Sequence, residues 1–147
     1  MMKVSTKGRY GLRIMLELAL QYGRSPVLAA TIAANQNISA NYIHLLIKDL
    51  RTSGLVMAMR GPNGGYSLAK APSVINVLQV IEALEGKTGV ADCVTTAQSC
   101  GRSEFCVARE VWMKVNKAVE VAMKEITLEQ LVLMQANCND ALLDFQI

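Results

Sequence analysis

Apolar residues recur at helical spacing through the first fifty positions and define a helix-turn-helix pattern. From Tyr10 to Tyr22 they fall three and four residues apart, which predicts an amphipathic helix that ends at Gly23. The alanine-rich segment 28–34 predicts a second, shorter helix. A polar turn follows at 35–37, after which Ser39 can cap a third helix that runs to about residue 53. Two short helices joined by a tight polar turn are typical of a helix-turn-helix.

The third predicted helix has two different faces. One is an apolar stripe that predicts contact with a core, made of Ile43, Leu46, Ile47 and Leu50. The other combines hydrogen-bond donors with positive charge, as a helix that enters the major groove of DNA needs: Asn41, His44, Lys48 and Arg51. An ordinary solvated helix face can carry similar residues, so this interpretation depends on the flanking segments.

Two short β-prone runs follow directly. They cover residues 55–59 and 66–68, and between them lies the turn Arg60-Gly61-Pro62-Asn63-Gly64-Gly65, which predicts a β-hairpin. Read alone, such a hairpin is common, but straight after a helix-turn-helix it is typical of a wing. Glycines let the backbone approach a ligand closely, and Arg60 can reach a phosphate or a narrow minor groove.

The second half is also predicted to be helical. Residues 76–84 form a short helix, residues 107–125 a long one, and Thr127 begins a last helix that runs to Ala136. The nineteen-residue helix spans about 28 Å, which suits pairing with a second subunit, although packing on its own domain would give the same pattern. Its apolar seam consists of Val107, Val111, Val115, Ala118, Val119 and Ala122, with Trp112 beside it.

The predicted fold is therefore mainly α, with an N-terminal winged helix-turn-helix, a small β-hairpin wing and a long dimerisation helix after it. We divide the chain into a DNA-binding region at 1–72, a connecting helix and cysteine-bearing loop at 73–106, and the long helix with a C-terminal helix at 107–147. The loop, residues 87–106, has almost no periodicity, and a structureless loop of this length usually has a function.

Charge separates the same two halves. Residues 1–72 hold nine Lys/Arg and two Asp/Glu, whereas residues 73–147 hold six and ten, within a net charge of +3. A basic half joined to an acidic one favours a polyanion-binding module with a second function attached, although chance clustering on a solvated surface is the alternative. No apolar run is long enough to span a membrane and no secretory signal is visible, so we expect a cytoplasmic protein. No phosphate loop, nucleophile–base pair or second histidine supports an enzyme or a small-molecule substrate.

The three cysteines of the loop, Cys93, Cys100 and Cys106, are separated by six and five residues. In a cytoplasmic chain such a group favours metal or redox chemistry over structural disulfides. An iron–sulfur cluster, zinc, a disulfide switch and inert thiols all remain possible on spacing alone, although zinc usually prefers paired CxxC-like spacings.

The ordered set of motifs resembles a known family. The segment 2–12 (MKVSTKGRYGL), the helix that starts at Ser39, the junction 54–56 and the run 60–66 (RGPNGGY) are together similar to the IscR/NsrR/RirA/CymR family of bacterial winged-helix regulators. The similarity extends from Lys3 to about Thr127, which is nearly the whole chain. Each piece is common by itself, but the ordered set is very specific.

This resemblance implies a homodimer that binds a double-stranded DNA operator through the first helix, the recognition helix and the wing. Carried over residue by residue, the DNA-binding set is Lys3, Ser5, Lys7, Arg9, Ser39, Asn41, Tyr42, His44, Lys48, Arg51, Arg60, Gly61, Pro62, Asn63, Gly64 and Tyr66. We expect His44, the one histidine of the chain, to read bases rather than to bind metal. Similarity to IscR implies a repressor of iron–sulfur cluster assembly genes; sensing of nitric oxide, iron or redox state, or response to a protein partner without a cluster, is the alternative.

The resemblance also implies an iron–sulfur cluster on the three loop cysteines, with [2Fe–2S] favoured over [4Fe–4S]. IscR-type members often place a histidine three residues after the third cysteine, and here that residue is Arg109, which has no lone pair to give. Nitric-oxide-sensing members use an acid near the start of the first helix, where this chain has Lys7-Gly8-Arg9. The fourth ligand is left open among Asp92, Glu104, Glu110 and Cys138.

Overall fold

The computed structural model describes residues 4–87 and 89–145 and places a helix-turn-helix at the start of the chain. The helices are α1 (Thr6–Leu20), α2 (Ala29–Gln36) and α3 (Ala40–Thr52). Sequence periodicity placed the start of α1 four residues too late, because the helix begins at the Ser5 cap, whose hydroxyl accepts a hydrogen bond from the Gly8 N–H at 3.0 Å. Asn37 ends α2 in the left-handed conformation at φ 52°.

The wing is a two-stranded antiparallel hairpin formed by β1 (Val56–Met59) and β2 (Gly65–Leu68), as expected. Its base is fixed to the α1–α2 connection, because Val27 and Tyr66 exchange two backbone hydrogen bonds of 2.8 Å each. Gly65 allows this approach: its φ is 142°, and a Cβ there would lie 2.6 Å from the Val27 carbonyl oxygen.

One apolar core holds these elements together. The predicted apolar stripe of α3 is confirmed, since Ile43, Leu46, Ile47 and Leu50 are buried together with Ile14, Met15 and Leu18 of α1. The helix α4 (Val77–Glu85) lies against α1 so closely that a Cβ on Gly11 would be 2.0 Å from Leu84 Cδ1. Glycine at this position lets the two helices approach.

Beyond the wing, the chain passes through η1 (Pro72–Val74) into α4, whose start is capped by Asn76 and Gln79 in a capping box. The cysteine loop contains two short turns that the sequence did not predict, α5 (Asp92–Thr95) and η2 (Ala97–Ser99). The long helix α6 (Val107–Glu125) has the predicted bounds, and α7 (Leu128–Asp144) runs eight residues beyond the predicted end at Ala136.

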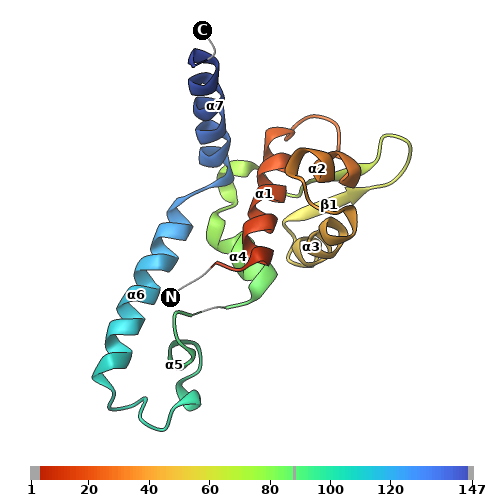
Figure 1. Cartoon of the computed structure of the whole chain (residues 1–147). Helices are drawn as coiled ribbons and strands as arrows, with labels where there is room; N and C mark the ends of the chain where they lie inside the picture. The colour runs from red at the N-terminus through yellow and green to blue at the C-terminus, as the bar shows by residue number, and fades with distance from the viewer. Residues whose placement is uncertain (1–3, 88, 146–147) are drawn as a thin grey trace.

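The two C-terminal helices follow one another along one side of the molecule (Figure 1). Their junction is fixed to the core, because Val77 N–H donates to the Ile126 carbonyl, Leu128 N–H donates to the Ile75 carbonyl, and the Leu128 side chain is fully buried. From this junction, α7 projects past the core in one direction, and α6 leads in the other to the cysteine loop around α5. Within the part of the chain that is described, no helix is long and apolar enough to cross a membrane.

Candidate nucleic-acid interface and cysteine loop

The polar face of α3 is open to solvent, as a DNA-reading surface must be. Asn41, His44, Lys48 and Arg51 are all exposed. The structure shows a local role for two other predicted contacts on this helix. The Ser39 hydroxyl accepts from the Tyr42 N–H at 3.3 Å and caps α3, and the Tyr42 ring packs edge to face on Tyr10 with centroids 6.0 Å apart.

The basic start of α1 lies beside α3. Lys7 Nζ is 2.7 Å from Asp49 Oδ2, so this ion pair ties the first turn of α1 to the recognition helix. Arg9 is exposed, and its guanidinium donates to Thr6 Oγ1 at 3.2 Å. Lys3 lies outside the described residues. The first turn of α1 thus presents Arg9 to solvent and uses Lys7 to hold α3.

A polar network that the sequence analysis missed positions the turn between α2 and α3. Glu17 is buried on α1, and its two carboxylate oxygens accept from the side-chain amides of Asn35 and Gln36, the latter at 2.8 Å. Arg13 Nε donates to Gln36 Oε1 at 3.0 Å, and its Nη2 donates to the Gln36 carbonyl. A glutamate within the apolar pattern of α1 was the available signal. The network fixes the end of α2 and therefore the entry to α3.

The wing presents its predicted contacts at its tip. Arg60, Gly61, Pro62 and Asn63 are exposed, whereas Gly64 is buried by the backbone of the turn. Tyr66 is half-buried at the base of the wing, and its hydroxyl lies 3.1 Å from His44 Nδ1. The wing, α2 and α3 lie on the side of the molecule away from α6 (Figure 1).

The cysteine loop is attached to α6 at two points. The Val90 N–H donates to Asn116 Oδ1 at 3.2 Å, and Arg109 Nε donates to the Cys93 carbonyl at 2.8 Å. Arg109, which stands where the IscR-type histidine is expected, therefore binds loop backbone. Between these attachments and α6 the loop is largely exposed, with Phe105 at 89%.

All three loop cysteines are free thiols. Cys93 lies in α5, Cys100 is exposed, and Cys106 is the N-cap residue of α6 without a side-chain capping bond. Within the described residues no three His, Cys, Asp or Glu side chains form a group that could hold a metal ion, so the structure does not gather these thiols. Their chemistry nevertheless fits an iron–sulfur cluster, because three thiols occupy one loop in which Cys100 is exposed and Cys93 and Cys106 are only half-buried.

The possible fourth ligands differ in position. Asp92, Glu104 and Glu110 are exposed on the loop or in the first turn of α6. Cys138 is exposed on α7, beyond the predicted end of that helix at Ala136. Because α7 leads away from the loop (Figure 1), the nearby carboxylates are the better-placed donors within this chain.

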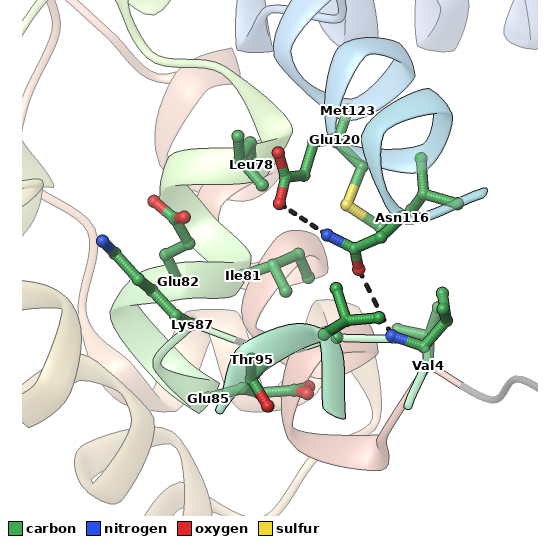
Figure 2. Close-up of a pocket in the computed structure, with 14 residues that line it drawn as sticks. Val4, Leu78, Ile81, Glu82, Glu85, Lys87, Thr95, Asn116, Glu120 and Met123 are labelled. Carbon is green, nitrogen blue, oxygen red and sulfur yellow. Dashed lines mark hydrogen bonds between the residues drawn. The ribbon is translucent and has the colours of Figure 1, made fainter. Parts of the chain in front are cut away.

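A cavity of about 730 Å³ is lined by residues of α4, α6 and the start of the cysteine loop (Figure 2). Asn116 lies on the α6 wall, where its side-chain amide donates to Glu120 Oε1 at 2.7 Å while its side-chain carbonyl accepts from the Val90 N–H of the loop. On the α4 wall, Glu85 accepts a hydrogen bond from the Ser5 hydroxyl. The loop and the capped start of α1 therefore meet at the same cavity.

Comparisons with known proteins agree with this arrangement. Residues 4–133 match the family model Rrf2, described as an iron-dependent transcriptional regulator. The HTH-type transcriptional regulator CymR of Bacillus subtilis is 38% identical over 130 residues, which cover 88% of this chain and 89% of that protein. The regulator IscR of Erwinia tasmaniensis is 36% identical over 131 residues, covering 89% and 79%.

Solved structures give the same result. CymR, described as the global cysteine regulator of B. subtilis, superposes with a TM-score of 0.77 at 36% identity, covering 91% of this chain and 98% of that one. The IscR of T. potens superposes with a TM-score of 0.75 at 39% identity, covering 92% and 88%. These relatives are transcription regulators rather than enzymes. The winged helix-turn-helix, its exposed basic face and these similarities together show that the chain belongs to the Rrf2 family of transcriptional regulators.

Proposed function

We propose that the protein acts in the cytoplasm as a dimeric repressor whose affinity for its operator changes with an iron–sulfur cluster on Cys93, Cys100 and Cys106. The observation that carries the proposal is the loop of three free thiols, attached to α6, in a member of a family described as iron-dependent. Genes for cluster assembly are the proposed targets, because a regulator that senses cluster supply can then adjust that supply.

The two faces of α6 support dimerisation. One face turns towards α4 and the loop, where Val115, Asn116 and Val119 are half-buried. The opposite face exposes Val107 at 76%, Val111 at 51% and Val121 at 41%. No residue of this nineteen-residue helix is buried within its own chain. This mainly apolar stripe, which the exposed Lys114 interrupts, is turned away from the chain that carries it and fits a seam for a second copy.

The charge and exposure of the N-terminal half support operator binding. Arg9 of α1, Lys48 and Arg51 of α3, and Arg60 of the wing are all exposed in the half of the chain that holds nine of the fifteen Lys and Arg residues. A helix-turn-helix places its second helix in the major groove, and the backbone contacts of flanking elements set its register. We infer that Asn41 and His44 of α3 read bases, whereas the basic residues of α3, α1 and the wing contact phosphates.

The loop residues have separate roles in this proposal. The three thiolates would hold the cluster, and Arg109 would keep the backbone at Cys93 close to the start of α6, where Cys106 lies. When bound, the cluster supplies an iron- and redox-dependent crosslink within the loop. A [2Fe–2S] cluster is proposed, which the three thiolates and one of Asp92, Glu104 or Glu110 would hold; a carboxylate ligand would bind iron less firmly than a thiolate.

The contacts at the cavity supply a route from the loop to DNA. Gathering three thiols must rearrange the exposed segment between Cys93 and Cys106. The loop begins directly after α4, whose last residue, Glu85, accepts a hydrogen bond from the Ser5 cap of α1. Lys7, which is two residues after Ser5 in α1, forms an ion pair with Asp49 on α3. Movement of the loop can therefore change how α1 and α3 meet the operator.

The similarity to CymR favours a second candidate, a regulator of the same fold that responds to a protein partner or to cysteine supply without a cluster. The two candidates are separated by operator binding of anaerobically purified protein before and after iron chelation. The proposal expects the visible absorption and the operator affinity to change together. Tight binding that does not respond to chelation would favour the second candidate.

A further inference from the structure

One pair of side chains joins the recognition helix to the wing. His44 Nδ1 on α3 and the Tyr66 hydroxyl oxygen on β2 are 3.1 Å apart, which is hydrogen-bond distance. The two rings also meet edge to face, with centroids 6.1 Å apart and planes inclined by 68°. The pair therefore lies between the two elements that face DNA in a winged-helix domain.

Tyr66 is the firmly held member of this pair. Its backbone donates to and accepts from Val27 at 2.8 Å in each direction, and it pairs with Ala58 of β1 on its other side. Its ring packs against the core. His44, by contrast, is exposed, and an exposed side chain without a partner samples several rotamers. The hydrogen bond therefore restrains His44 rather than Tyr66.

We propose that Tyr66 is a positioning residue for sequence recognition, because its hydroxyl holds the His44 ring in one orientation before DNA binds. Nδ1 is then engaged by the wing, and Nε2 is the ring nitrogen that can meet a base edge. A tyrosine hydroxyl can donate or accept, so it fixes the place of the ring and leaves the choice of base to the imidazole. Holding a side chain in its bound orientation lowers the cost of ordering it on binding.

This inference rests on the proposed docking of α3 in the major groove. Beyond docking, it requires that the Tyr66 hydroxyl affects base preference through His44. If the Tyr66 hydroxyl contacts a phosphate by itself, its removal weakens binding to all sequences equally and does so whether or not His44 is present. If it acts through His44, its removal alters base preference and has no effect once the imidazole is gone. A double-mutant cycle distinguishes these roles.

The experiment selects bound sequences from a randomised DNA duplex pool with the full-length protein and its His44→Ala, Tyr66→Phe and double variants. We expect Tyr66→Phe to reduce base preference at the same base pairs that His44→Ala affects. The reduction should be about 2- to 12-fold, which corresponds to the loss of one hydrogen bond. The double variant should match His44→Ala. Tyr22→Phe is the matched control, because it removes a hydroxyl from an exposed tyrosine in the turn after α1.

The failures of the two claims are distinguishable. If His44→Ala changes base preference and Tyr66→Phe does not, or if the two effects add, the positioning role is overturned while the docking stands. If His44→Ala changes no base preference, His44 does not read bases and the inference fails, whereas the docking of α3 fails only if the wild type itself selects no sequence. A measurement without DNA checks the contact itself: the NMR resonance of His44 Nδ1 should shift in Tyr66→Phe and stay in place in Tyr22→Phe, and an unchanged resonance in Tyr66→Phe would overturn the inference.

Discussion

Replacing Val111 and Val121 by glutamate should separate the proposed dimer into monomers. Both valines lie on the outward face of α6 and expose 51% and 41% of their surface. Full burial of a valine is worth about 1.5 kcal/mol, so burying the exposed half of each contributes about 0.7 kcal/mol. A twofold interface contains each residue twice, which gives about 3 kcal/mol in all, or roughly a hundredfold in the dimer Kd. Buried carboxylates add a further penalty.

Sedimentation equilibrium over a range of concentrations measures the dimer Kd of this double variant. Met113→Glu is the matched control, because Met113 is 46% exposed on α6 but lies on another face of the helix. We expect the control to remain dimeric and the double variant to lose operator affinity together with its dimer. A double variant that dimerises as tightly as the wild type would show that α6 is not the interface, and equal dissociation of the control would place the interface on another face.

Three further predictions test the fold and the DNA interface. Arg60→Ala and Lys48→Ala should each weaken DNA binding. Each should also reduce the slope of log Kd against log salt by about 0.9, the value for one phosphate contact; affinity that is unchanged in both variants would contradict the docking. Glu17→Ala should lower the free energy of unfolding by about 1–3 kcal/mol, because two amide groups lose their acceptor, whereas Glu17→Gln should lose less in the same denaturation assay. Gly65→Ala should destabilise the protein more than Gly61→Ala, although both glycines have positive φ, because only at Gly65 does a Cβ meet backbone; equal thermal shifts would mean that the approach to Val27 is not tight.

Spacing and capping residues in the sequence predicted those elements whose bounds depend on neighbouring residues. The apolar stripe of α3, its Ser39 cap and the bounds of α6 all follow from spacing and capping residues. The start of α1 was missed because its first turn is basic and polar, so the apolar periodicity begins only after the helix has begun. The last turns of α7 were missed for a related reason: Leu142 and Leu143 are exposed at 64% and 61%, so no buried apolar stripe marks this end of the helix.

The candidate residues of the site could be selected from the sequence, but the contacts between their side chains could not. The exposed face of α3, the wing hairpin and the cysteine group could be derived from spacing and turn residues, and the resemblance added DNA contacts for the wing and a cluster for the cysteines. The hydrogen bonds of Glu17 with α2, of His44 with Tyr66 and of Arg109 with the Cys93 carbonyl join residues 16 to 22 positions apart. Such contacts depend on how elements pack, and local hydrophobic periodicity holds no information about them.

The central claim is tested most directly by the visible absorption spectrum of anaerobically purified protein carrying single cysteine-to-serine substitutions. We predict that the wild type absorbs in the visible range, and that serine at 93, 100 or 106 abolishes this absorption and leaves a folded, dimeric protein. Cys138→Ser is the matched control and should keep the full spectrum, because Cys138 is on α7 and the loop lies at the far end of α6. A colourless wild type, a loop variant with its full spectrum, or a bleached Cys138→Ser would contradict the assignment of the cluster to these three cysteines.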